Sequence, residues 1–280
     1  MAYDLAIAYR VYPGISKSPA FYPDDKYRLV ELGLRSLRLA LGDSIRVRLF
    51  AVLDSCPKEY EKLVLEYFDP AHTDLILLDR AGNARTFLQQ IDLLLSQPYA
   101  ELVYFAEDDY LYRPNSFALA LDFMRRHDDA HFVTLYDHPD YYWLPLHRGQ
   151  VELRHSGGHL WRTAGTTCLT FLTRRSILRA TAPVFRTYCS GNFDASLWLV
   201  LTKHLVRSPL SMLKAALHSS IEATIIAKAW LFGWWRILLE RRWKLWCSIP
   251  SLATHMESTA LAPGVDWHTV AATVEQAYRS

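Results

Sequence analysis

Cysteine is scarce in this sequence. Its four cysteines, Cys56, Cys168, Cys189 and Cys247, are widely separated among 280 residues and form no CxxC pair. This spacing argues against a zinc site, and it is typical of a protein kept in a reducing, cytosolic compartment.

Long apolar runs and a strong net charge are missing too. No run of about 18 uncharged apolar residues occurs, so no transmembrane helix is predicted. Residues 1–5 contain no basic region leading into an apolar core, so no signal peptide is expected. The formal net charge of +2 argues against a polyanion binder, and no nucleic-acid partner is expected. At 51% hydrophobic residues, the chain can bury one large core or two small ones.

Strand and helix patterns alternate through the first 115 residues. Strands are predicted at 5–14 (ending in a turn), at 46–53, at 74–78 and in the apolar run from 102 up to the three acids at 107–109. Helices are predicted at 27–41, 58–68 and 84–95. This order predicts a parallel sheet with helices on both faces, in which ligands bind beyond the carboxyl ends of the strands. The carboxyl edge of this sheet should therefore carry Asp54, the turn at 82–85 and the acids at 107–109.

The most informative stretch is residues 102–112, where an apolar strand runs into Glu107, Asp108 and Asp109. Three adjacent carboxylates repel one another, and burying them without partners would be very costly. Something positive should sit at the end of this strand. Hard oxygen ligands suit Mg²⁺ or Mn²⁺, which usually reach protein sites together with phosphates. The alternative interpretation is a solvated acidic turn.

The first half resembles GT-A fold glycosyltransferases of the large family-2-like group. The resemblance rests on Val-Tyr-Pro at 11–13, Ala-Val-Leu-Asp-Ser at 51–55, Gly-Asn-Ala-Arg at 82–85 and Glu-Asp-Asp at 107–109, where the last motif is similar to the family's DXD-type motif. It implies an α/β fold of GT-A type, a Rossmann-like and mostly parallel central sheet flanked by helices. It also implies a nucleotide diphosphate-sugar donor and a divalent cation, Mn²⁺ or Mg²⁺. The implied donor contacts are Tyr9, Arg10, Tyr12, Asp54, Asn83, Arg85, Glu107 and Asp108, with Asp109 as a metal ligand.

The second half would then carry the acceptor side. A helix at 117–126 and a strand at 130–136 precede the aromatic-rich residues 137–143, which suit either sugar stacking or core packing. His155 and His159 flank two glycines, a pattern that fits a hairpin turn or, as the alternative, a metal pair. Residues 161–171 are predicted as one strand, whose small residues would allow a ligand to approach closely.

Two later residues gain roles from the resemblance. Asp194 begins a predicted helix and is followed by Trp198, as is the acidic general base of the family, which deprotonates the acceptor hydroxyl. The alternative is an acidic first-turn residue favoured by the helix dipole. His255 follows a strand-like, proline-bearing segment, and the resemblance implies that it returns to complete the metal site. The alternative is a histidine of the surface or the core.

Residues 207–246 form a basic, tryptophan-rich segment near the C-terminus. They hold five of the nine tryptophans and seven basic residues against two acids, a net charge of +5. Leucine and isoleucine recur at helical spacing between 210 and 225, which is typical of a helix lying in a membrane surface. The alternative is a helical lobe packed on the sheet with snorkelling Lys and Arg side chains.

These observations predict a single glycosyltransferase domain over 1–280. It divides into a nucleotide-sugar half at 1–115, an acceptor half at 116–205 and 247–280, and a helical insertion at 206–246 that associates with a membrane. The predicted reaction is metal-dependent and inverting transfer to a hydroxyl of a cell-surface glycan or lipid-linked saccharide, in the cytoplasm at the inner face of the membrane. One alternative is a metal-dependent nucleotidyltransferase or pyrophosphatase, for which residues 12–17 would make a poor phosphate loop. The other is a non-catalytic peripheral membrane protein.

Overall fold

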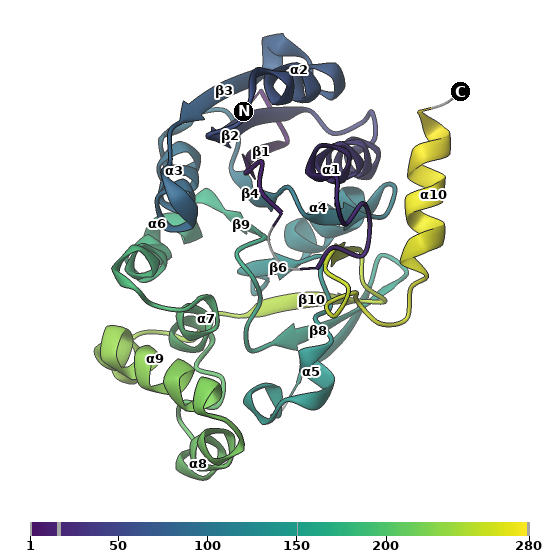
Figure 1. Cartoon of the computed structure of the whole chain (residues 1–280). Helices are drawn as coiled ribbons and strands as arrows, with labels where there is room; N and C mark the ends of the chain where they lie inside the picture. The colour runs from purple at the N-terminus through teal and green to yellow at the C-terminus, as the bar shows by residue number, and fades with distance from the viewer. Residues whose placement is uncertain (1, 16–17, 150, 279–280) are drawn as a thin grey trace.

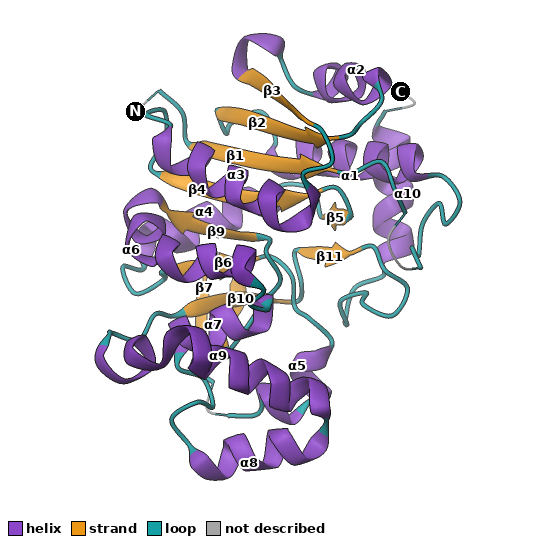
Figure 2. Ribbon diagram, turned by 60° about the vertical axis from the view of Figure 1, so that its left-hand side comes forward, coloured by secondary structure: helices purple, strands orange, loops and turns teal. Residues whose placement is uncertain are grey.

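A central sheet runs through most of the computed structural model, which describes residues 2–15, 18–149 and 151–278. Within these residues the sheet has nine strands in the order β3-β2-β1-β4-β9-β6-β10-β8-β7 (Figure 2). The first half supplies β1 Leu5–Val11, α1 Lys26–Leu41, β2 Val47–Asp54, α2 Lys58–Tyr67, β3 Thr73–Leu78, α3 Gly82–Ser96 and β4 Leu102–Glu107. Each of these elements was predicted, and the four strands pair in parallel.

The second half adds strands of both directions and most of the remaining helices. Its elements are β5 Tyr110–Tyr112, α4 Ser116–Arg126, β6 Phe132–Thr134, α5 Asp140–Trp143, β7 Leu153–Ser156, β8 His159–Ala164, β9 Phe171–Arg174, α6 Arg175–Phe185, α7 Asp194–Thr202, α8 Pro209–His218, α9 Ser220–Leu239, β10 Leu245–Ile249, β11 Ala253–His255 and α10 Trp267–Ala277, with short 3-10 turns at Pro70–His72, Pro145–His147 and Arg186–Ser190. β9 runs antiparallel to both β4 and β6, whereas β10 runs parallel to β6.

Two apolar layers hold helices against opposite faces of the sheet (Figure 1). In β1, Ile7 and Tyr9 pack into the layer formed with α1, α2, α4 and α10. Ala6 and Ala8 pack into the other layer, with α3, α6, α7 and α9. A strand buried on both faces reads as a continuous apolar run, because alternate side chains enter different cores.

The backbone of the second half tests two predictions, the strand at 161–171 and the turn between His155 and His159. The expected strand at 161–171 is wrong: β8 ends at Ala164 and β9 begins at Phe171, and β10 and β6 lie between them in the sheet. The connecting loop has to cross two strands, and its small residues let it pass closely over His204, 2.5 Å from a Cβ built on Gly165. The glycines at 157 and 158 adopt positive φ and join β7 to β8 in a hairpin, as predicted for the turn between His155 and His159.

A second, two-stranded sheet lies beside the carboxyl ends of β1 and β4 (Figure 2). Its strands are β5, which follows the acidic turn, and β11, which arrives from the C-terminal part of the chain. The antiparallel register places His255 opposite Tyr110. This pairing fixes the distance between the acidic turn and a histidine that lies far away in the sequence.

Helices α8 and α9 form a lobe between α7 and β10, at residues 207–246. Buried residues of α9 pack on α7, and Ser196 donates a hydrogen bond of 2.8 Å to the Ile225 carbonyl. Gly233 breaks the helical backbone of α9, and a Cβ built on it would lie 2.5 Å from a methyl of Val200. The insertion is therefore seated on the domain by the packing of α9 on α7. The described residues contain no helix long and apolar enough to cross a membrane. The division of the chain at 115, 206 and 246 stays a prediction.

We expect Gly233→Ala to lower the free energy of unfolding by about 1–3 kcal/mol, because the added methyl overpacks the α7–α9 contact. Urea denaturation of the purified chain measures the change. Ala227→Leu, on an exposed position of the same helix, is the control and should have little effect. Combining Gly233→Ala with Val200→Ala should recover part of the loss; an additive loss would contradict the contact.

Candidate active site

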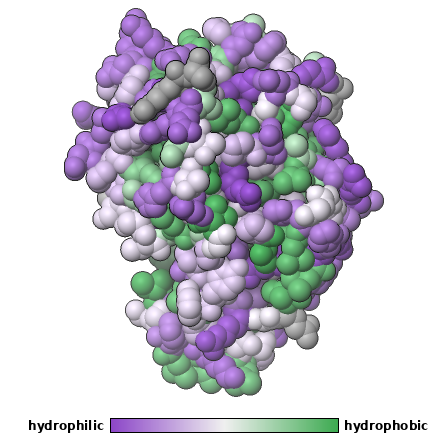
Figure 3. Space-filling view, turned by 90° about the vertical axis from the view of Figure 1, so that its right-hand side faces the viewer, coloured by the Kyte–Doolittle hydropathy of each residue, from purple (hydrophilic) through white to green (hydrophobic). Residues whose placement is uncertain are grey.

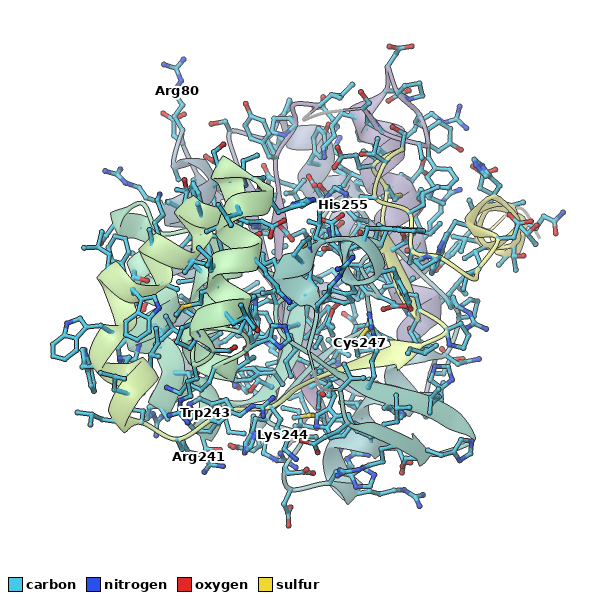
Figure 4. All side chains as sticks on the ribbon, turned by 90° about the horizontal axis from the view of Figure 1, so that it is seen from below. Arg80, Arg241, Trp243, Lys244, Cys247 and His255 are labelled. Carbon is cyan, nitrogen blue, oxygen red and sulfur yellow. The ribbon has the colours of Figure 1, made fainter. Side chains whose placement is uncertain are left out.

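A cleft of about 640 Å³ opens at the carboxyl edge of the parallel strands. The ends of β1, β2 and β4, the start of α1 and the first turn of α3 surround it. Its lining includes Arg10, Tyr12, Lys26, Asp54, Arg80, Asn83, Glu107, Asp108 and Asp109. The acids at the end of β4 thus meet cations from β1 and α1. Arg80 points outward from the β3–α3 loop at the periphery of the molecule (Figure 4).

Asp54 organises the wall of this cleft. Its two carboxylate oxygens accept hydrogen bonds from the backbone N–H groups of Ala81 and Gly82, at 2.9 and 2.8 Å. The next residue, Ser55, accepts one of 2.7 Å from the Arg80 N–H. An anion held at the first turn of a helix is stabilised by the unpaired N–H groups there. Asp54 is 3% exposed, so it fixes the β3–α3 loop and presents little of its carboxylate to the cleft.

Glu107 is held on both sides of its carboxylate. One oxygen accepts from the Arg10 guanidinium, and the other accepts from the Thr170 hydroxyl at 2.7 Å. Arg10 also donates to the side-chain and backbone oxygens of Asn83, and the Asn83 amide donates 3.2 Å to the Tyr188 hydroxyl. A chain of charge-assisted bonds therefore fixes Arg10 on the cleft wall.

Asp108 makes a buried ion pair beneath the cleft. Its oxygens accept from the Lys26 ammonium and from the Tyr12 backbone N–H, both at 2.9 Å. Burial raises the pKa of Asp108 to about 6, although Lys26 opposes the rise and the neighbouring Asp109 adds to it. Both oxygens are engaged within the protein, so Asp108 anchors the β1–α1 loop and the start of α1.

Asp109 differs from its two neighbours because one of its oxygens is free. Its Oδ2 lies 3.0 Å from His255 Nε2, while Oδ1 is buried and has no hydrogen-bond partner among the described residues. Burial raises the pKa of Asp109, but the charge and the hydrogen bond of His255 outweigh this and lower it to about 2. His255 Nδ1 makes no hydrogen bond with the described residues, but it lies 3.8 Å from Glu257 Oε2.

The donor set of Asp109 and His255 fits a divalent cation that a ligand completes. An orphaned buried carboxylate oxygen beside an imidazole is the kind of pair that Mn²⁺ accepts, and Mg²⁺ commonly keeps only one or two protein carboxylates. The described residues contain no group of three or more His, Cys, Asp or Glu side chains placed to hold a metal ion by themselves. Oxygens from a bound phosphate would have to supply the remaining ligands.

Asp194 begins α7, as predicted, and one of its oxygens accepts 2.6 Å from the Ala195 N–H. Its charge reaches two groups that border the acidic turn. Burial and then Asp194 raise the pKa of Cys168, with smaller contributions from Glu107 and Asp109. The pKa of Tyr188 is raised by burial; Arg10 opposes the rise and Asp194 adds to it. Asp194 lies outside the lining of the cleft, and Tyr188, whose pKa it affects, accepts a hydrogen bond from Asn83 of the cleft wall.

The structure does not bring every predicted residue to the cleft. Tyr9 is completely buried in the core on the α1 side, and its hydroxyl has no hydrogen-bond partner within the described parts of the chain. Arg85 is exposed on α3 and does not line the cleft. Conversely, no local pattern pointed to Lys26, Thr170 or Tyr188, which pair with Asp108, Glu107 and Asn83 from distant elements.

Comparison with known proteins yields similar folds and no family. No family model matches the sequence, and no curated protein matches it. Residues 1–349 of TarS from S. aureus are 12% identical over 81% of this chain and 70% of that chain, with a TM-score of 0.41. The 4-diphosphocytidyl-2C-methyl-D-erythritol synthase from Anaerococcus prevotii is 9% identical over 100% and 97% of the two chains, with a TM-score of 0.44. The galactosyltransferase LgtC, in complex with donor and acceptor sugar analogues, is 10% identical over 69% of each chain, with a TM-score of 0.39. Similarity at this level does not identify a function.

Proposed function

We propose that the chain transfers a sugar from a nucleotide diphosphate-sugar to a hydroxyl acceptor, with the donor bound in the cleft at the carboxyl edge of the sheet. The observation that carries the proposal is the free, buried Oδ1 of Asp109 beside His255, in a cleft that also holds Arg10 and Lys26. Buried acids that meet fixed cations form a site for a ligand that brings both a metal ion and phosphate charge.

Different residues of the cleft would bind the metal ion, the phosphates and the nucleoside of the donor. Asp109 and His255 would hold Mn²⁺ or Mg²⁺, which neutralises charge on the leaving diphosphate when it is bound. Arg10, fixed by Glu107 and Asn83, offers the guanidinium of the cleft wall to a phosphate oxygen. Asn83 and Tyr12 line the same wall, where a ribose or base would lie.

Asp194 is our candidate general base. It stands at the start of α7 and influences Cys168 and Tyr188, which border the acidic turn. A carboxylate on that side can take the proton of an acceptor hydroxyl as the hydroxyl attacks the sugar carbon. Attack from the face opposite the leaving diphosphate inverts the anomeric carbon. We propose a glycan or lipid-linked saccharide as the acceptor.

Incubation with a panel of sugar nucleotides and Mn²⁺ tests the proposal. We expect release of a nucleoside diphosphate that rises when a hydroxyl acceptor is present. Release of pyrophosphate from a nucleoside triphosphate and a sugar phosphate would instead assign a nucleotidyltransferase. Tyr12, Pro13, Gly14 and Ile15 provide no basic side chain to such a phosphate loop; Ser16 and Lys17 lie outside the described residues. No turnover of either kind would favour a non-catalytic protein.

Glu107→Gln should raise the KM for the donor by about tenfold, because losing a charge-assisted hydrogen bond costs about 1.5–3 kcal/mol and leaves Arg10 loosely held. Steady-state kinetics at saturating Mn²⁺ measures the change. Thr170→Val is the matched control, since it removes the other bond to Glu107 and keeps the ion pair; its effect should be smaller. A higher Mn²⁺ requirement with an unchanged KM would instead make Glu107 a metal ligand.

A further inference from the structure

Exposed apolar side chains are concentrated on the α8–α9 lobe. Of the 18 large apolar side chains that are exposed in the described residues, nine belong to residues 207–246: Leu210, Leu213, Leu217, Ile221, Leu231, Trp234, Trp235, Leu238 and Leu239. Leu217 and Leu239 are 78% and 79% exposed. An apolar surface of this density marks an interaction site. Figure 3 shows apolar residues gathered at the lower end of the molecule, where Figure 1 places α8.

The exposed residues follow the helical period within each helical segment. On α8 they are spaced by three and four residues at 210, 213 and 217. In the part of α9 that follows the break at Gly233, they lie at 234, 235, 238 and 239, again three and four residues apart. Each helix therefore carries a continuous apolar stripe on the side away from the domain. Buried Ala229, Gly233 and Ile237 form the opposite side of α9.

This surface is held firmly from behind. Lys203 donates to the Arg236 carbonyl, and Arg207 donates to the Ile237 carbonyl at 3.0 Å, so two cations cap the end of α9. Trp230 Nε1 contacts Met212 Sδ at 3.3 Å, which joins α9 to α8. The apolar stripes thus belong to a rigid lobe and would not need to refold before meeting a partner.

The exposed charges of the lobe are mostly basic. Arg207, Lys214, Arg241 and Arg242 are exposed, whereas Lys244 at the end of the lobe is paired with Asp129 and Glu152 at 3.0 and 2.6 Å. The two acids of the lobe are neutralised or covered: Glu240 pairs with Arg236 at 2.6 Å, and Glu222 is 2% exposed. The exposed charge of the lobe is therefore almost entirely positive.

We propose that the α8–α9 lobe docks on an anionic lipid bilayer, with its apolar stripes in the interfacial region and its cations against the headgroups. Exposed Trp beside Leu, flanked by Lys and Arg, matches the layered chemistry of a bilayer surface. A second copy of the chain would bring like charges together, whereas anionic headgroups complement them. The inference goes beyond the transfer reaction and does not depend on it.

Vesicle co-sedimentation tests the docking without any assay of turnover. The wild-type chain should pellet with vesicles of equal parts phosphatidylcholine and phosphatidylglycerol at low salt, and far less with phosphatidylcholine alone. Raising the salt should release it through screening. Lys214→Glu should weaken the partition at least tenfold, since losing one cation at an anionic surface costs about fivefold and the reversal adds repulsion. Lys214 is exposed and makes no hydrogen bond or ion pair with the other described residues, so the fold should be unaffected.

The triple variant Leu231→Ser, Trp234→Ser, Leu238→Ser should lose binding to a similar or larger extent, because it removes one face of α9. Leu77→Ser combined with Leu153→Ser is the control: these exposed leucines lie on β3 and β7, the two edges of the sheet, and binding should not change. Circular dichroism shows whether each variant is folded. The proposal is overturned if the wild type stays in the supernatant at low salt. It is also overturned if sedimentation velocity shows that the wild type is a dimer and the triple variant is a monomer. The lobe would then bind a second copy of the chain.

Discussion

Asp109→Asn should reduce donor turnover by roughly 10²-fold or more while the fold survives. The substitution keeps the size of the side chain and removes the charge whose free oxygen lies beside His255. A neutral amide cannot offset the charge of a cation, so the leaving diphosphate would lose its main stabilisation. The measurement is nucleoside diphosphate release over a range of Mn²⁺ concentrations.

Two further variants make this result interpretable. His255→Ala should raise the Mn²⁺ concentration needed for half-maximal activity, because it removes the second ligand and leaves the first. Asp122→Asn is a matched control on α4, where Asp122 pairs with Arg126 on the surface, and it should behave as wild type. Near-normal turnover of Asp109→Asn at saturating Mn²⁺ would exclude Asp109 from the reaction.

Asp194→Asn should reduce transfer to the acceptor by about 10²-fold, the contribution typical of a positioned general base. Binding of the nucleotide should change little, because Asp194 lies outside the lining of the cleft. Single-turnover transfer and nucleotide binding are measured on the same preparation. Normal transfer by the variant, or loss of nucleotide binding, would contradict the assignment.

A competing role for Asp194 is stabilisation of α7 from its first turn. Asp266→Asn is the matched control, since Asp266 caps α10 by accepting hydrogen bonds of 3.1 Å from the N–H groups of His268 and Thr269. Asn caps a helix about as well as Asp does, so Asp266→Asn should lose only the interaction of the negative charge with the helix dipole, with a small loss of stability and intact transfer. If Asp194→Asn lowers only the free energy of unfolding, as Asp266→Asn should, then Asp194 is structural.

The first half of the chain could be predicted from sequence because its signals are local. Apolar runs of strand length alternate with segments of helical period, and a chain of that order closes into a parallel sheet with few choices. The position of Asp54 and of residues 107–109 on one edge follows from that topology alone. His255 was found through the resemblance, and the β5–β11 pairing supplies the physical reason for its position.

The roles within the acidic triplet could not be predicted, because each acid is defined by a partner from another part of the chain. Lys26 donates a hydrogen bond to Asp108. Arg10 and Thr170 donate hydrogen bonds to Glu107. One oxygen of Asp109 has no hydrogen-bond partner among the described residues. Nothing in the local sequence distinguishes the three carboxylates. The strand expected at 161–171 failed for a similar reason, since apolar composition does not reveal that β6 and β10 separate β8 from β9.

The central claim is that the cleft binds a nucleoside diphosphate together with a divalent cation held by Asp109. Calorimetric titration of the nucleoside diphosphate, with and without Mn²⁺, tests it most directly. For the wild type we predict that Mn²⁺ tightens binding at least tenfold, since the ion and the phosphates complete one another's site. In Asp109→Asn this benefit should be largely lost. The claim would be contradicted if Mn²⁺ left the affinity of the wild type for the nucleoside diphosphate unchanged. It would also be contradicted if Mn²⁺ tightened binding equally in both proteins.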